Sequence, residues 1–109
     1  MAIKSINASQ LNDKMNKKES LILVDCRELN EWQLGKIPGA IFIPLSDFSQ
    51  KFPDNLKDKK AQIILQCRSG ARSMKAAYLL EEQGFTDLTN LAGGILGWNE
   101  EGFEVEIGE

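Results

Sequence analysis

The sequence predicts one α/β domain with a mainly parallel five-stranded sheet and helices on both of its faces. Short apolar, β-type runs alternate with segments of helical periodicity along the whole chain. Such alternation favours parallel strands joined by crossover helices. The chain has 109 residues, 42% of them hydrophobic, which is enough for one core and too few for two. We therefore expect a single domain over residues 1–109.

The strands are predicted from short β-rich runs between turn signals. The apolar stretch at residues 21–24 is typical of a strand buried on both faces. Pro44 ends the third predicted strand, and the first strand has the weakest pattern. The predicted strands are residues 5–7, 21–24, 41–43, 62–66 and 87–91.

The helices are predicted from apolar periodicity and capping residues. Ser9 is a candidate N-cap, Gly35 is expected to end the second helix, and a third is expected to end before Pro53. The strongest pattern is residues 73–83, where Met74, Ala77, Tyr78 and Leu80 mark one face and a glycine follows. The predicted helices are residues 9–16, 29–34, 46 or 47 to 52, 73–83 and 94–99.

Composition excludes several classes of function. The net charge of -3 leaves no dominant basic face, so we expect no nucleic-acid partner. The chain has no histidine, which removes Cys–His and Ser–His catalysis. Its two cysteines lie in no metal-binding spacing, so we expect no metal and no cofactor.

The sequence has no apparent leader or membrane-spanning segment. Its N-terminal residues lack the apolar core of a signal peptide, and its longest aliphatic run spans only residues 21–24. We expect a soluble, cytoplasmic protein without a membrane partner, and a monomer at this size.

The chemistry is expected at residues 63–73. A predicted buried strand ends at Cys67, a glycine-containing loop follows, and an amphipathic helix comes next. This arrangement directs several backbone N–H groups into one concavity that attracts anions. An ordinary thiol is only about 3% thiolate at pH 7, and a helix N-terminus with nearby arginine raises that fraction. Cys67 is therefore the candidate nucleophile.

Two arginines in the loop strengthen this hypothesis. Arg68 and Arg72 lie where cations oppose the helix dipole, and an anionic substrate bound between them would offset that cost. In the alternative interpretation, Cys67 is a small buried residue and both arginines are solvated.

The segment Cys67-Arg68-Ser69-Gly70-Ala71-Arg72-Ser73 resembles the active-site loop of rhodanese domains. The likeness covers nearly the whole chain. It includes LVDCRE at residues 23–28, GKIPGA at residues 35–40, and the ending GF…LAGGI…W at residues 84–98.

The resemblance implies a rhodanese-like three-layer fold and a sulfurtransferase. Cys67 would take a sulfane sulfur from a small anionic donor such as thiosulfate. The persulfide would pass it to cyanide or to a thiol or protein acceptor. The substrate-binding residues would be Arg68, Ser69, Gly70, Ala71 and Arg72.

Asp25 and Arg27 are candidate supporting residues because they end a strand near the same edge of the sheet. They either form a charge network beside the pocket or an ion pair that fixes the next loop. Trp98 is expected in the core, and Gly93-Gly94 in a turn with positive φ.

Two positions depart from the family pattern. Lys36 stands where the family has histidine, a position that we interpret as structural. Cys26 stands where a small aliphatic residue is usual. We favour a buried structural role for it over a second redox thiol that would form a disulfide with Cys67.

Other functions remain as alternatives. Tyrosine phosphatases place five residues between their loop Cys and Arg, whereas Cys67 and Arg72 enclose four. A non-enzymatic docking or persulfide-carrier module for one protein partner is the main alternative, because a carrier shares the first half-reaction with a free enzyme.

Overall fold

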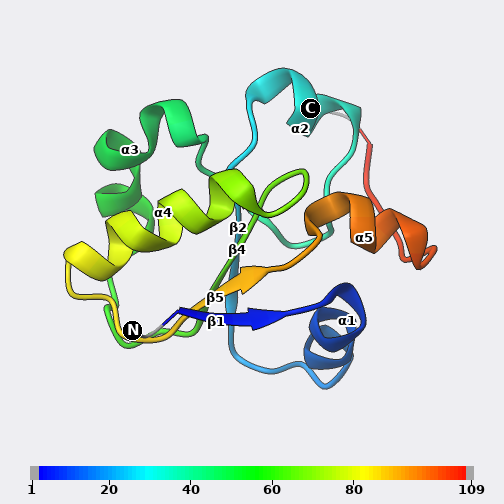
Figure 1. The fold of residues 1–109 in the computed structure, drawn as a ribbon, viewed down its shortest axis with the longest axis horizontal. Coiled ribbons are helices and arrows are strands. Elements are labelled where there is room, and N and C mark those ends of the chain that lie inside the picture. The colour runs from blue at the N-terminus through cyan, green and yellow to red at the C-terminus, as the bar shows by residue number, and fades with distance from the viewer. Residues whose placement is uncertain (1–2, 108–109) are drawn as a thin grey trace.

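A computed structural model of the chain, which describes residues 3–107, has a central parallel sheet between two layers of helices (Figure 1). The five strands run in the order β1-β5-β4-β2-β3, and every pairing is parallel. The predicted fold class is confirmed. The strands are β1 (Ile3–Ile6), β2 (Ile22–Asp25), β3 (Ile41–Phe42), β4 (Ile63–Gln66) and β5 (Leu88–Leu91).

Helices from different parts of the chain cover the two faces of the sheet. They are α1 (Ala8–Asn16), α2 (Leu29–Leu34), η1 (Leu45–Asp47, a 3-10 turn), α3 (Phe48–Asn55), α4 (Ala71–Glu82) and α5 (Gly94–Glu100). Helices α3 and α4 lie on one face, and α1 and α5 lie on the other. The core between the sheet and the α3–α4 layer contains Val24, Leu65 and Leu80. The core on the α1–α5 side contains Leu11, Leu23 and Trp98. The expected core position of Trp98 is thus confirmed.

The first predicted helix is correct, but its predicted cap is wrong. The side-chain oxygen of Asn7 accepts a hydrogen bond from the backbone N–H of Gln10, and Gln10 accepts one from the N–H of Asn7. This reciprocal capping box begins the helix at Ala8, so Ser9 lies inside it. Asn7 therefore belongs to the helix start, and β1 ends at Ile6.

The third helix runs through Pro53 and does not end before it. Proline deletes one intrahelical hydrogen bond, but aromatic packing of the preceding residue stabilises the helix. The ring of Phe52 stacks on Phe48 and meets Phe85 edge-on, with ring centroids 5.8 and 6.0 Å apart. Tertiary packing therefore outweighs the helix-breaking effect of Pro53.

Helix α4 begins at Ala71, two residues before the predicted start. Gly70 has φ of 110° and reverses the chain so sharply that its carbonyl already accepts from the N–H of Met74. The buried face of α4 consists of Ser73, Ala76, Ala77 and Leu80. Tyr78, predicted on that face, is exposed because the side chains of α4 that meet the sheet lie one position earlier.

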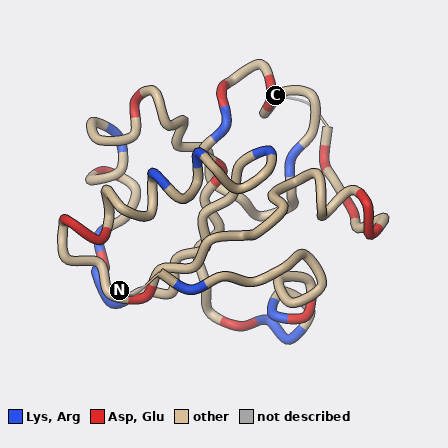
Figure 2. Tube along the Cα trace, in the orientation of Figure 1, with Lys and Arg blue, Asp and Glu red and all other residues tan. Residues whose placement is uncertain are grey.

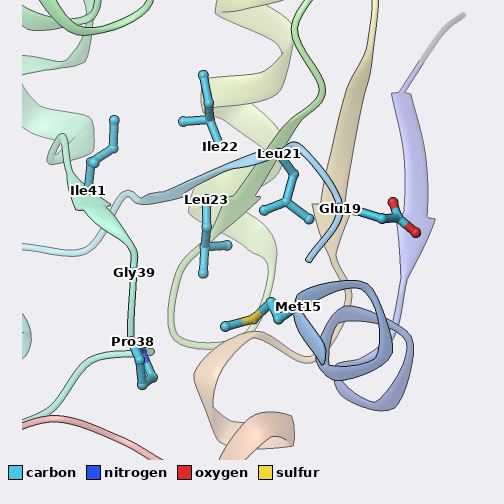
Figure 3. Close-up of a pocket in the computed structure, with 8 residues that line it drawn as sticks. All are labelled: Met15, Glu19, Leu21, Ile22, Leu23, Pro38, Gly39 and Ile41. Carbon is cyan, nitrogen blue, oxygen red and sulfur yellow. The ribbon is translucent and has the colours of Figure 1, made fainter. Parts of the chain in front are cut away.

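A hollow of about 370 Å³ lies near the starts of β2 and β3, at the opposite edge of the sheet from Cys67. Figure 3 shows Met15 of α1, Leu21, Leu23 and Pro38 around this largely apolar space. None of its lining residues belongs to the predicted active-site loop.

Two further findings concern the described residues. No helix within residues 3–107 is both long and apolar enough to span a membrane. The same residues contain no group of three Cys, Asp or Glu side chains placed to hold a metal ion.

Candidate active site

Cys67 directly follows β4 in the middle of the sheet, and three residues connect it to α4. Carboxyl ends of parallel strands are where α/β folds bind ligands, because the loops and helix N-termini gather there. The loop of Arg68, Ser69 and Gly70 curls back over the thiol. The backbone N–H of Gly70 lies 3.1 Å from Sγ of Cys67.

The surroundings of Cys67 favour its thiolate. Burial opposes ionisation, and hydrogen bonds to the sulfur act against it. The donors are the hydroxyl and backbone N–H of Ser73, together with the backbone N–H groups of Gly70 and Ser69. The hydrogen bonds outweigh burial, so the pKa of Cys67 lies below its ordinary value. The first turn of α4 therefore does part of the work that a histidine base does in other cysteine enzymes.

The hydroxyl of Ser73 connects Cys67 to β5. Its Oγ lies 3.4 Å from Sγ of Cys67 and 2.5 Å from Oδ1 of Asn90. Asn90 is buried and donates from Nδ2 to the carbonyl of Gly70, so its Oδ1 is an acceptor. The single hydroxyl proton can point to the amide, to the carbonyl of Gly70 at 3.2 Å, or to the sulfur. A thiolate would draw it to the sulfur.

The far side of the loop is held by α5. The carbonyls of Cys67 and Arg68 accept from the N–H groups of Ile95 and Leu96, at 2.9 and 3.1 Å. Gly94 permits this approach because it has φ of 56° and no side chain. A Cβ there would lie 2.5 Å from the carbonyl oxygen of Cys67. The Gly93-Gly94 turn, which sequence predicted correctly as one with positive φ, therefore also fixes the active-site loop.

The two loop arginines lie in different surroundings. Arg72 makes a two-pronged ion pair with Glu31 of α2, with N–O distances of 2.7 and 2.8 Å. Arg68 is exposed and has no ion pair within residues 3–107. Ser69 and Ala71 are also exposed at the mouth of the loop. Of the five predicted substrate-binding residues, Ser69 and Gly70 donate hydrogen bonds to the sulfur, and Arg72 is already paired with Glu31.

Asp25 and Arg27 form a buried, multiply bonded ion pair beneath this site. The Nε and Nη2 atoms of Arg27 lie 2.8–3.1 Å from the carboxylate of Asp25. Arg27 also donates to the carbonyls of Gly35 and Glu31. This pair fixes the loop that carries α2, which agrees with the structural interpretation of these residues. Its bond to the Glu31 carbonyl connects the pair to the residue that contacts Arg72.

Cys26 lies beside Cys67 at the ends of neighbouring strands. Asp25 and Gln66 are paired in register, and the N–H of Cys26 donates to the carbonyl of Gln66 at 2.7 Å. Cys26 is fully buried in the α3–α4 core. Burial, with the negative charges of Asp25 and Cys67, strongly raises its pKa. Both thiols are free. These surroundings agree with a structural Cys26.

The side chain of Lys36 lies against the indole of Trp32, with its Nζ 4.5 Å from the ring centroid. Its backbone pairs with that of Glu106. This placement agrees with a structural role for the position.

Sequence reasoning missed three residues that shape the site, namely Glu31, Asn90 and Ser73 in its role as a donor. Ser73 had a local signal, since a hydroxyl in the first helical turn commonly faces the loop before it. Glu31 and Asn90 are 41 and 17 residues away from their partners. Their roles depend on which strands and helices become neighbours.

Comparison with known proteins agrees with this arrangement. The family model of the rhodanese-like domain matches residues 7–101. The chain belongs to the rhodanese-like family.

Two relatives and one solved structure match almost its whole length. YtwF of Bacillus subtilis is 41% identical over 101 residues, covering 93% of this chain and 95% of that protein. The thiosulfate sulfurtransferase GlpE of Pseudoalteromonas translucida is 33% identical, covering 90% of each chain. A rhodanese-like domain protein from Staphylococcus aureus superposes with a TM-score of 0.81 and 34% identity, over 97% of this chain and 99% of that one.

Proposed function

We propose that this protein is a sulfurtransferase that carries a sulfane sulfur as a persulfide on Cys67. The observation that carries the proposal is the position of the Cys67 thiol. It lies within hydrogen-bond reach of the Gly70 N–H and the Ser73 hydroxyl, and its pKa is lowered there. Membership of the rhodanese-like family and the named activity of the GlpE relative support the same reaction class.

The reaction has two steps. In the first, the thiolate of Cys67 attacks the outer sulfur of a donor such as thiosulfate, and the S–S bond of the donor breaks to release sulfite. In the second, a thiolate or cyanide attacks the outer sulfur of the persulfide. Cys67 then leaves as thiolate, and the acceptor becomes a persulfide or thiocyanate. Neither step needs a metal or an organic cofactor.

The loop residues have distinct roles in this proposal. The N–H groups of Ser69, Gly70 and Ser73 stabilise the negative charge on the thiolate and on the terminal sulfur of the persulfide. Arg68 attracts the anionic donor at the mouth of the loop. Ala71 is small and leaves the mouth open, and Arg72 adds positive charge that Glu31 partly offsets.

The proposal is tested by the mass of the intact protein after incubation of the reduced chain with thiosulfate. We expect one added sulfur atom, which is removed by cyanide with formation of thiocyanate. The adduct should persist in Cys26→Ala and be absent from Cys67→Ser. Absence of an adduct on the wild type with thiosulfate and with an organic persulfide would exclude this function.

A persulfide carrier differs from a free enzyme only in the second step. Turnover with cyanide or small thiols at a rate similar to that of loading indicates an enzyme. Rapid loading followed by release only to a protein acceptor indicates a carrier.

A further inference from the structure

Charges of both signs are closely matched around Cys67. Six charged side chains belong to the loop, to the first turn of α4, or to the β2–α2 segment beside them. They are Arg27, Arg68 and Arg72, and Asp25, Glu28 and Glu31. Along the chain as a whole, basic and acidic positions are likewise interspersed (Figure 2). The mouth of the site is therefore not a concentrated positive field of the kind that suits a doubly charged anion.

The ion pair of Arg72 with Glu31 joins the first turn of α4 to α2. Both terminal nitrogens of Arg72 contact separate carboxylate oxygens of Glu31. This paired geometry is the strongest that arginine makes with a carboxylate. A donor that approaches Cys67 therefore meets an arginine whose charge is already compensated.

Glu31 is held in place by its own helix as well as by Arg72. Its Oε1 accepts from the backbone N–H of Glu28 at 2.9 Å, which completes the capping box of α2. The hydrogen bonds with Arg72 lower the pKa of Glu31 to about 2, although partial burial acts against them. The carboxylate thus stays charged and stays against Arg72 at any pH near neutrality.

We propose that Glu31 is a specificity-determining residue that makes the site favour singly charged sulfane donors, such as thiosulfonates and persulfide anions, over the thiosulfate dianion. This inference rests on the proposed sulfurtransferase function. Thiosulfate still loads Cys67, but the second negative charge gains little from a compensated Arg72 and is repelled by Glu31. A singly charged donor is repelled less strongly by Glu31.

The test compares two donors that share a tetrahedral sulfur centre and differ by one charge. Thiosulfate carries two negative charges and methanethiosulfonate carries one, and they release sulfite and methanesulfinate when Cys67 takes their outer sulfur. The measured quantity is the ratio of kcat/KM for thiosulfate to that for methanethiosulfonate, with cyanide as acceptor. In Glu31→Gln this ratio should rise about three- to tenfold at low salt, because one negative charge beside Arg72 is removed. The rise should shrink as ionic strength increases.

Glutamine is chosen because its amide oxygen can still accept a hydrogen bond from the backbone N–H of Glu28, which preserves the capping of α2. Glu82→Gln is the matched control. It removes the same charge at the far end of α4, about 18 Å along the helix from the loop. The donor ratio should not change in this control. In an Arg72→Met background the charge of Glu31 is no longer compensated, so Glu31→Gln should still raise the donor ratio, by at least the same factor.

A second variant keeps the test independent of the folding of Glu31→Gln. Glu28 also acts electrostatically on Arg72, and its carboxylate is held by the hydroxyl of Ser46 at 2.8 Å. Glu28→Gln should raise the donor ratio in the same direction by a smaller factor.

The outcomes separate the two proposals. A wild type that is loaded by both donors, with a ratio unmoved by Glu31→Gln and Glu28→Gln, overturns the role of Glu31 and leaves the sulfurtransferase function standing. A fall in kcat/KM by the same factor for both donors also overturns it, since that pattern assigns Glu31 to positioning alone. A wild type that neither donor loads overturns the proposed function itself.

Discussion

The hydroxyl of Ser73 lies 3.4 Å from Sγ of Cys67, although the two residues are separated by a loop and the first turn of α4. The same oxygen lies 2.5 Å from Oδ1 of Asn90 on β5. Ser73 therefore links the Cys67 thiol, which follows one central strand, to a buried amide on the next strand. The sharp turn at Gly70 makes this possible, because it places the third helical residue directly over the thiol.

Ser73→Ala should destabilise the thiolate form of Cys67 relative to the thiol. The substitution removes a hydrogen bond to the sulfur, so the pKa of Cys67 should rise and the pH profile of sulfur loading should move to higher pH. Below the pKa the loading rate should fall about three- to tenfold, as expected for one hydrogen bond of ordinary net strength. At high pH the two rates should converge. Stopped-flow loading between pH 5 and pH 10 measures this, and a profile identical to that of the wild type would contradict it.

Gly94→Ala should disturb the loop from the α5 side. The added Cβ would collide with the backbone of Cys67 and Arg68, and the positive φ is unfavourable for alanine. We expect a loss of about 2–4 kcal/mol in the free energy of unfolding, with slower loading of Cys67.

Gly39→Ala is the matched control for Gly94. Gly39 also has positive φ, 86°, but a Cβ there meets no atom within 4 Å. The cost should be about 1 kcal/mol, the conformational part alone. Urea denaturation of both variants separates the two contributions, and equal losses would show that the contact with the loop does not matter.

The strand-loop-helix unit at Cys67 could be predicted from sequence because its determinants are local. A buried run at residues 63–66, a glycine at 70 and a helical pattern afterwards define it with few alternatives. The core position of Trp98 and the positive φ of Gly93 and Gly94 were predictable for the same reason.

The electrostatics of the site could not be predicted in this way. Sequence suggested that Arg72 faces an anionic substrate, but its partner in the structure is Glu31, which arrives from α2. That contact exists because β2 lies beside β4, which brings α2 over the loop. Asn90 reaches Ser73 because β5 lies on the other side of β4. No periodicity in the sequence encodes this strand order.

Cys67 should be the only thiol that reacts in the folded protein. Both thiols are almost fully buried, but the pKa of Cys26 is raised, whereas that of Cys67 is lowered. Brief treatment with iodoacetamide at pH 7 should add one label, at Cys67, and a second should appear only after denaturation. Peptide mass spectrometry locates the labels, and modification of Cys26 in the native state would contradict the prediction.

Glu31→Gln should destabilise the protein at neutral pH and lose that effect in acid. The pKa of Glu31 is lowered from its ordinary value to about 2 by Arg72, so the folded state holds fewer protons here than the unfolded state. The stabilisation is complete above pH 4.5 and disappears as the pH falls through 2.

At pH 6 the variant should lose about 1 kcal/mol, since both side chains are partly exposed to solvent. The difference should approach zero near pH 2, whereas Glu82→Gln should match the wild type throughout. Urea titrations at pH 6, 4 and 2 measure it, and a constant difference across this range would mean that the carboxylate charge contributes nothing.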